Sequence, residues 1–161
     1  MKRAFAVIAA ASAMIATPVL AEDFSGPRVG VELGIQGDDF LSSHDTSYGV
    51  NVGYDFDLGY SVFGVTGSYT GLFDDNGADY RELGIGGRAG VKLAPPTLLY
   101  ASAGYSNIDF KGLPGSIDGV KLGLGVEQSF GNLFANAETR YGNYEAGIET
   151  YQTVIGIGYR F

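Results

Sequence analysis

Hydrophobic and polar residues alternate along the end of the chain, residues 151–161. One face is apolar and aromatic and consists of Tyr151, Thr153, Ile155, Ile157, Tyr159 and Phe161. The opposite face is mostly small or polar and consists of Gln152, Val154, Gly156, Gly158 and Arg160. A period of two indicates a β-strand, and lipid outside with a polar lumen inside would explain both faces better than a soluble core does. An ordinary sheet strand at a chain end is the alternative that this stretch alone leaves open.

The same alternation recurs in seven earlier stretches, which predicts an all-β chain. The predicted strands cover residues 28–36, 47–56, 60–70, 80–93, 98–106, 119–130, 133–141 and 151–161. Residues 60–70 are the least regular, because Val62 and Gly67 interrupt the alternation. Eight strands are the smallest usual transmembrane barrel. The sequence therefore predicts an eight-stranded antiparallel transmembrane up-and-down β-barrel.

Short turns and longer acidic connections alternate between these strands. The turns fall at residues 57–59, 95–97 and 131–132, and the longer connections at residues 37–46, 71–79, 107–118 and 142–150. Outer-membrane barrels have short periplasmic turns and long external loops. On this arrangement the outward aromatics form a loop-end band of Tyr48, Tyr69, Tyr105, Tyr141 and Tyr151, and a turn-end band of Tyr54, Phe56, Phe63, Phe130, Tyr159 and Phe161. Two such bands predict the aromatic girdles of the two membrane interfaces.

The N-terminus has the order of a secretory signal peptide. A basic start at residues 2–3 precedes an apolar run at residues 4–15, and the small Ala21 precedes two acidic residues. This order predicts cleavage after Ala21, with residues 1–21 as the signal peptide and residues 22–161 as the outer-membrane β-barrel domain. A transmembrane anchor is the alternative, but the apolar run is short for a membrane span.

The composition excludes several classes of protein. The chain has no Cys, so neither a disulfide framework nor a lipid-modified Cys is expected. Its net charge of −8, which becomes −10 without Lys2 and Arg3, leaves no basic footprint for nucleic acid. The 26 glycines and 11 tyrosines fit strands with a small inner face and an aromatic outer face.

Several motifs carry a family resemblance. An inward Gly precedes an outward Tyr at Gly53–Tyr54, Gly104–Tyr105 and Gly158–Tyr159, residues 138–141 read Glu-Thr-Arg-Tyr, and the chain ends on Phe161. With these features the chain resembles the OmpA-like and opacity-protein-like family of small Gram-negative outer-membrane barrels, which belong with the porins of the cell envelope. The resemblance implies an outer-membrane location after secretion to the periplasm. It also implies that the barrel-assembly machinery reads Ile157, Tyr159 and Phe161 as an assembly signal.

OmpA-type proteins can continue into a peptidoglycan-binding domain, whereas this chain stops at the barrel, so no anchoring role is expected.

Charged residues fall on the inward face of the predicted strands. The basic ones are Arg28, Arg88, Lys92, Lys121, Arg140 and Arg160, and the acidic ones are Glu32, Asp55, Glu82, Glu127 and Glu138. Only Arg81 has outward parity, and it lies at the loop end. A nearly balanced lumen favours ion pairs, because an isolated buried charge is costly. We expect a charge network centred on Glu138 and Arg140 that also includes Glu32, Arg88, Lys121 and Glu127.

Three functions fit a barrel of this kind. The leading hypothesis is a structural and surface-interaction role, with the lumen plugged by ion pairs and a surface ligand contacted by acidic loops, because eight strands leave room for side chains but not for a wide channel. The second is a small porin-like channel, and the third is an outer-membrane hydrolase acting at the loop end. A secreted soluble barrel is disfavoured by the outward apolar rows. Lipid of the outer membrane is the expected environment.

Catalysis and metal binding find little support in the sequence, and no cofactor is expected. His44 is the only His and has Ser42 and Ser43 beside it, but no third partner for a catalytic triad is indicated. Asp38–Asp39 and Asp74–Asp75 could hold a divalent cation through oxygen ligands, although such pairs are more often solvated loop charge. The chain is therefore expected not to be an enzyme.

Deleting Phe161 is expected to reduce assembly more than it reduces the stability of barrel that has already inserted. The reason is that the last strand resembles a recognition signal for insertion. Membrane yield in cells and urea unfolding of the purified barrel measure the two effects, and Phe161→Tyr is the control that keeps a terminal aromatic. Equal membrane yields of the full-length and shortened chains would contradict the prediction.

Overall fold

Eight antiparallel strands close into a barrel in the computed structural model, which describes residues 24–38, 44–73, 80–94, 96–110 and 115–161. The strands are β1 (Gly26–Asp38), β2 (His44–Asp57), β3 (Ser61–Phe73), β4 (Tyr80–Ala94), β5 (Thr97–Phe110), β6 (Ser116–Phe130), β7 (Leu133–Tyr144) and β8 (Ile148–Arg160). Each strand pairs with its neighbours in sequence, and β1 also pairs with β8. The predicted fold is confirmed, with every predicted strand present.

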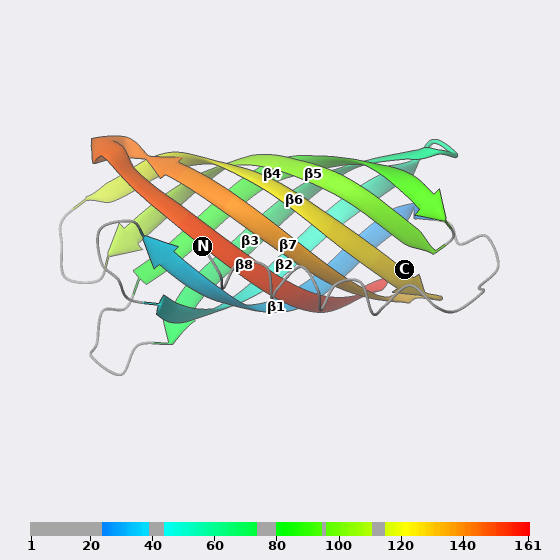
Figure 1. Ribbon diagram of the computed structural model, residues 1–161, viewed down its shortest axis with the longest axis horizontal. Helices are drawn as coiled ribbons and strands as arrows, with labels where there is room; N and C mark the ends of the chain where they lie inside the picture. Colours follow the sequence, from blue (N-terminus) through cyan, green and yellow to red (C-terminus); the bar gives the residue numbers. More distant parts are fainter. Residues whose placement is uncertain (1–23, 39–43, 74–79, 95, 111–114) are drawn as a thin grey trace, which may run out of the picture.

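The pairing register climbs steadily around the barrel. Following cross-strand partners from Arg28 on β1 through all the other strands returns to β1 at Asp38, a shift of ten residues. A stagger of this kind requires the strands to tilt against the barrel axis, and Figure 1 shows them crossing that axis obliquely. Residues at equal distances from their strand ends therefore lie at different heights in the lumen.

Side chains on the two faces are sorted as the alternation predicts. Val31, Leu124 and Ile157 on the outer face are 52%, 68% and 65% exposed. On the inner face, Glu32 and Glu127 are 4% and 0% exposed. An apolar outside and a polar inside invert the arrangement of a soluble barrel and suit a lipid environment. Among the described residues, no helix has the length and apolar character needed to cross a membrane.

The strands extend further at the loop end than the sequence analysis expected. Residues 107–109 and 116–118, predicted as loop, pair with one another as the ends of β5 and β6. The predicted loop 142–150 contains only the 3-10 helix η2 (Glu145–Gly147) between β7 and β8. The inward side chains here are apolar, since Ile108 and Tyr144 pack with Leu72 and Ile117. The sequence analysis expects polar residues on the inner face of a strand. It therefore assigns these strand ends, whose inward side chains are apolar, to the loops.

The turns and the C-terminus lie together at one end of the barrel, the right-hand end in Figure 1. Several aromatic side chains of the predicted girdles are in ring contact, with centroid separations of 4.9 Å for Tyr54–Phe56 and 5.0 Å for Tyr159–Phe161 at this end. At the loop end, the ring centroids of Tyr141 and Tyr151 lie 5.3 Å apart. The predicted signal peptide lies outside the described residues, so its cleavage stays a prediction.

Inward glycines make room for long side chains from neighbouring strands. A Cβ at Gly123 would collide with Glu138 Oε1 and Ser102 Oγ. On the outer face, a Cβ at Gly67 would instead lie 3.8 Å from Val52 Cγ2, an ordinary contact. The inner glycines are thus part of the packing of the lumen charges.

Gly123→Ala is expected to lower the free energy of unfolding by about 1–3 kcal/mol, the usual cost of overpacking. Gly67→Ala is the matched control and is expected to have little effect, because its methyl group would meet only two ordinary contacts, Val52 Cγ2 at 3.8 Å and Gly84 O at 4.0 Å. Urea unfolding in detergent measures both. Equal stabilities for the two variants would contradict the packing role of Gly123.

Candidate functional site in the barrel lumen

Inward charged side chains form three groups along the lumen within the part of the chain that the structure describes. The turn-end cluster consists of Arg28, Asp55, Arg88, Glu127 and Arg160. The central cluster consists of Glu32, Glu138 and Arg140. The loop-end pair consists of Glu82 and Lys121.

In the turn-end cluster, two arginines share two fully buried carboxylates. Arg88 binds Asp55 in bidentate geometry, with Nε and Nη2 donating over 3.0 and 2.6 Å, and its Nη1 donates to Glu127 Oε2 over 2.6 Å. Arg160 Nη2 donates to Glu127 Oε1 over 2.6 Å and to Asp55 Oδ2 over 3.3 Å. Both carboxylates are 0% exposed. Charge-assisted bonds of this number and geometry offset the cost of removing the ions from water.

Aromatic and apolar side chains surround the turn-end cluster. The Arg160 guanidinium lies 5.0 Å from the ring centroid of Phe24 and 5.4 Å from that of Phe134, which gives it cation–π contacts. The Arg88 guanidinium lies 5.0 Å from the Tyr100 ring. A small buried apolar cluster completes the surroundings and consists of Phe24, Val62, Leu98 and Tyr100. The cluster is therefore enclosed at the turn end by groups that exclude water.

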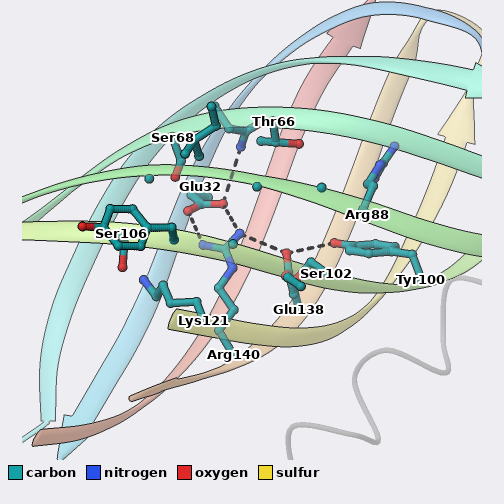
Figure 2. A pocket seen from close by; sticks show the side chains of 18 of the residues that line it. Glu32, Thr66, Ser68, Arg88, Tyr100, Ser102, Ser106, Lys121, Glu138 and Arg140 are labelled. Carbon is teal, nitrogen blue, oxygen red and sulfur yellow. Dashed lines mark hydrogen bonds and ion pairs between the residues drawn. The ribbon is translucent and has the colours of Figure 1, made fainter. Parts of the chain in front are cut away.

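The central cluster joins β1 to β7 across the lumen, as Figure 2 shows. Arg140 donates to Glu32 through both terminal nitrogens, over 2.6 and 2.9 Å, and to Glu138 Oε2 over 3.0 Å. Glu138 also accepts hydrogen bonds from the hydroxyl groups of Ser102, over 2.5 Å, and Tyr100, over 3.1 Å. Every carboxylate oxygen of Glu138 thus has a donor.

The loop-end pair connects β4 to β6. Lys121 Nζ lies 2.5 Å from Glu82 Oε1, which also accepts a hydrogen bond of 3.2 Å from the Tyr144 hydroxyl. The Tyr144 hydroxyl in turn accepts one of 3.1 Å from Ser106. This chain of polar contacts lies directly beneath the apolar contact of Ile108 and Tyr144 at the loop end.

A cavity of about 100 Å³ lies beside the central cluster. Small side chains of β3, β4 and β5 form much of its wall, among them Thr66, Ser68, Gly84, Gly86 and Gly104. Ser68 and Ser106 also line this space, and both are labelled in Figure 2. A polar cavity of this size can hold a few water molecules. The central cluster therefore does not fill the cross-section of the lumen, whereas the carboxylates of the turn-end cluster, Asp55 and Glu127, do not line the cavity and are fully buried.

The predicted network is divided differently in the structure. Glu32, Glu138 and Arg140 come together as expected from their inward parity. Arg88 and Glu127, which were expected to join them, bind Asp55 and Arg160 instead, and Lys121 binds Glu82. The reason is the climb of the register, because heights estimated by counting from strand ends ignore the stagger.

Sequence analysis missed three polar or aromatic contributors to the lumen. Phe24 precedes the first strand and has no alternation to reveal it. Asn51 and Tyr100 have inward parity, but only the three-dimensional arrangement shows that Asn51 contacts Arg28 and Tyr100 contacts Glu138. Inward parity on a predicted strand was the one available signal for these two residues.

The candidate catalytic and metal-binding residues are only partly described. The backbone of His44 pairs with Gly37 at the start of β2, and Ser42 and Ser43 lie outside the described residues, as do Asp39, Asp74 and Asp75. Within the described ranges, no three His, Cys, Asp or Glu side chains gather as they would to bind a metal ion.

Asp57, the last residue of β2, forms a further ion pair with Lys92 at the turn-end mouth of the barrel. The Asp57 carboxylate also accepts hydrogen bonds from the backbone N–H groups of Phe24, over 2.9 Å, and Gly59, over 2.8 Å.

A closed eight-stranded barrel with apolar side chains outside and ion pairs inside defines a small outer-membrane barrel. The chain belongs to the family described as outer membrane protein beta-barrel domain, which matches residues 4–161. Its location is therefore the bacterial outer membrane. No curated protein sequence matches the chain.

Solved structures share this fold at low sequence identity. Neisserial surface protein A (NspA) is 16% identical, with a TM-score of 0.58, and the match covers 84% of this chain and 96% of NspA. Ail, the attachment invasion locus protein of Yersinia pestis, in complex with the heparin analogue sucrose octasulfate, is 19% identical, with a TM-score of 0.57 and coverage of 85% and 97%. The outer membrane enzyme PagL is 12% identical, with a TM-score of 0.60 and coverage of 83% and 99%. At these identities the likeness establishes the fold alone.

Arg88→Met is expected to lower the free energy of unfolding by on the order of 3–5 kcal/mol, because Asp55 and Glu127 would stay buried with fewer partners. Arg140→Met is expected to cost less, since the adjoining cavity can hydrate Glu32 and Glu138. Urea unfolding in detergent compares the two. Equal losses would contradict the difference in hydration between the clusters.

A double-mutant cycle tests the Glu32–Arg140 contact within this prediction. Glu32→Gln combined with Arg140→Met is expected to cost less than the two single changes added together, because each single change already removes the ion pair between these two residues. Strict additivity would contradict a direct energetic coupling between these side chains.

Proposed function

We propose that the protein is a closed outer-membrane barrel with a structural and surface-interaction role, whose lumen is plugged by ion pairs and whose acidic loop end makes contacts outside the cell. The observation that carries the plug is that Arg88 and Arg160 both bridge the fully buried carboxylates of Asp55 and Glu127. Opening a path through this cluster would separate paired charges in a poorly hydrated interior, which costs several kcal/mol for each ion left alone.

Charge supports the surface role and narrows its chemistry. Exposed acidic side chains at the loop end include Asp45, Asp109 and Glu145, and the net charge of the chain is −8. A partner with a complementary basic surface would be attracted to this end. Ail is seen with sucrose octasulfate, a sulfated and therefore anionic molecule. The acidic loop end of this chain does not favour the same class of ligand.

Biogenesis completes the proposal. Residues 1–21 would direct secretion to the periplasm as a cleaved signal peptide. Outward Ile157, Tyr159 and Phe161 at the turn end would serve as the signal for the barrel-assembly machinery, and their exposure of 65%, 42% and 70% leaves them accessible. After insertion the same side chains would face lipid.

A small channel is the second candidate, and the cavity beside the central cluster favours it. The cavity would supply part of an aqueous path, and only the turn-end cluster would then need to open.

A hydrolase at the loop end draws support from the fold that the chain shares with PagL. That likeness concerns the fold, and the sequence offers Ser42, Ser43 and His44 without a third catalytic partner.

The refolded barrel is expected to show no steady conductance in a planar bilayer at neutral pH, because the turn-end cluster blocks the lumen. Changing both Arg88 and Arg160 to Ala is expected to raise ion leakage, whereas Arg81→Ala, at an exposed position on the outward face, is the control and is expected to have no effect. Large steady conductance of the unchanged protein would overturn the plug and favour the channel.

A further inference from the structure

Phe24 lies where the chain enters the barrel, and its environment is unlike that of the other lumen residues. It is 1% exposed and packs with Val62 and Leu98, which are both 0% exposed. Its ring also faces two cations, with the Arg160 guanidinium 5.0 Å and Lys92 Nζ 5.2 Å from the centroid. An aromatic ring thus lies between the turn-end mouth and the turn-end cluster.

Backbone contacts hold this segment in the mouth. The Phe24 N–H donates to Asp57 Oδ2 over 2.9 Å, and the Asp57 N–H donates to Ser25 Oγ over 3.1 Å. Asp57 is also paired with Lys92, which contacts the Phe24 ring. The segment is therefore fixed to the last residue of β2 by a reciprocal pair of hydrogen bonds, although it belongs to no strand until Gly26.

The central cluster does not close the lumen by itself. The cavity beside it reaches from Arg88 and Tyr100 to Ser106 and Lys121, so it spans the height of the central cluster. Exclusion of water from Asp55 and Glu127 on the side of the turns depends on what covers them there. Phe24 and its apolar neighbours cover the two carboxylates on that side.

We propose that Phe24 and Ser25 form an N-terminal plug, in which the Phe24 ring seals the turn-end mouth and keeps water away from the turn-end cluster. This proposal rests on the closed lumen proposed above. It adds a second barrier of a different kind: the ion pairs block the passage of ions, and the ring protects those ion pairs from solvent. Phe24 and Ser25 follow shortly after the expected cleavage site at Ala21. They would thus lie inside the barrel near the start of the mature chain.

Accessibility of a single thiol tests the plug, because the chain has no Cys. Val62→Cys places the thiol beneath the Phe24 ring, and a charged methanethiosulfonate reagent is applied to the folded barrel in detergent. Labelling is expected to be slow with Phe24 present, and faster by roughly tenfold to a hundredfold in Phe24→Ala, the factor that corresponds to losing the burial of one phenylalanine ring. Ser106→Cys is the matched control at the loop-end side of the cavity, and its labelling rate is expected to be the same with either residue at position 24.

Two labelling results would overturn the plug. One is an unchanged rate for Val62→Cys when Phe24 is replaced by Ala. The other is a rate in the presence of Phe24 that equals the rate of Tyr60→Cys, a position that is 88% exposed. Steady conductance of the unchanged protein would overturn the proposed closed barrel whatever the labelling shows, so the two failures are distinguishable.

A second measurement keeps the ring and does not depend on the folding of Phe24→Ala. The chain has no Trp, so Phe24→Trp introduces a single tryptophan at the mouth, which is excited at a wavelength where the 11 tyrosines do not absorb. Its emission is expected to be blue-shifted and poorly quenched by acrylamide compared with Tyr60→Trp. Equal emission maxima and equal quenching for the two variants would overturn the plug.

Discussion

Arg160 links the closure of the sheet to the neutrality of the lumen. Its backbone N–H donates to Asn132 O over 2.7 Å, and the Asn132 side-chain amide donates back to Arg160 O over 2.7 Å, so the end of β8 is fixed against the turn between β6 and β7. Its guanidinium crosses the lumen to Asp55 and Glu127. A barrel in which β1 and β8 have not paired leaves strand edges unpaired in lipid and, here, separates Asp55 on β2 from Arg160 on β8. A barrel that is not closed therefore loses backbone hydrogen bonds and an ion pair of Arg160 together.

Inner charges also specify the register of the strands. Replacing buried ion pairs by well-packed apolar residues is often neutral or stabilising, so stability alone does not explain them. A shift of one residue in the pairing of a strand would turn the inner face of that strand outward. Arg140 of the central cluster would then face lipid, where a basic residue near the midplane costs about 2–4 kcal/mol. Inner glycines act in the same direction, because Gly123 leaves space for Glu138 only in the observed register.

Alternation along the chain was sufficient to predict the strands, their faces and the two ends, because each depends on local sequence and on contact with lipid or lumen. The grouping of the charges was not predictable in this way. Arg88 binds Asp55 and Glu127 rather than Glu138 because the register shifts by ten residues around the barrel, a property of all eight ladders together. Phe24 could not be found either, since a residue ahead of the first strand has no period and its contacts are made by residues far along the chain.

Neutrality of the lumen is reached only when the clusters are taken together. The turn-end cluster has three arginines and two carboxylates, and the central cluster has one arginine and two carboxylates. Asn51 lies between them, with Arg28 Nη1 3.5 Å from its Oδ1 and Glu32 Oε2 3.5 Å from its Nδ2. The excess cation and the excess anion thus face one another through an amide that can donate to one and accept from the other. Because Coulomb interactions in a poorly hydrated interior are long-ranged, loss of a charge in one cluster changes the electrostatic balance of the other.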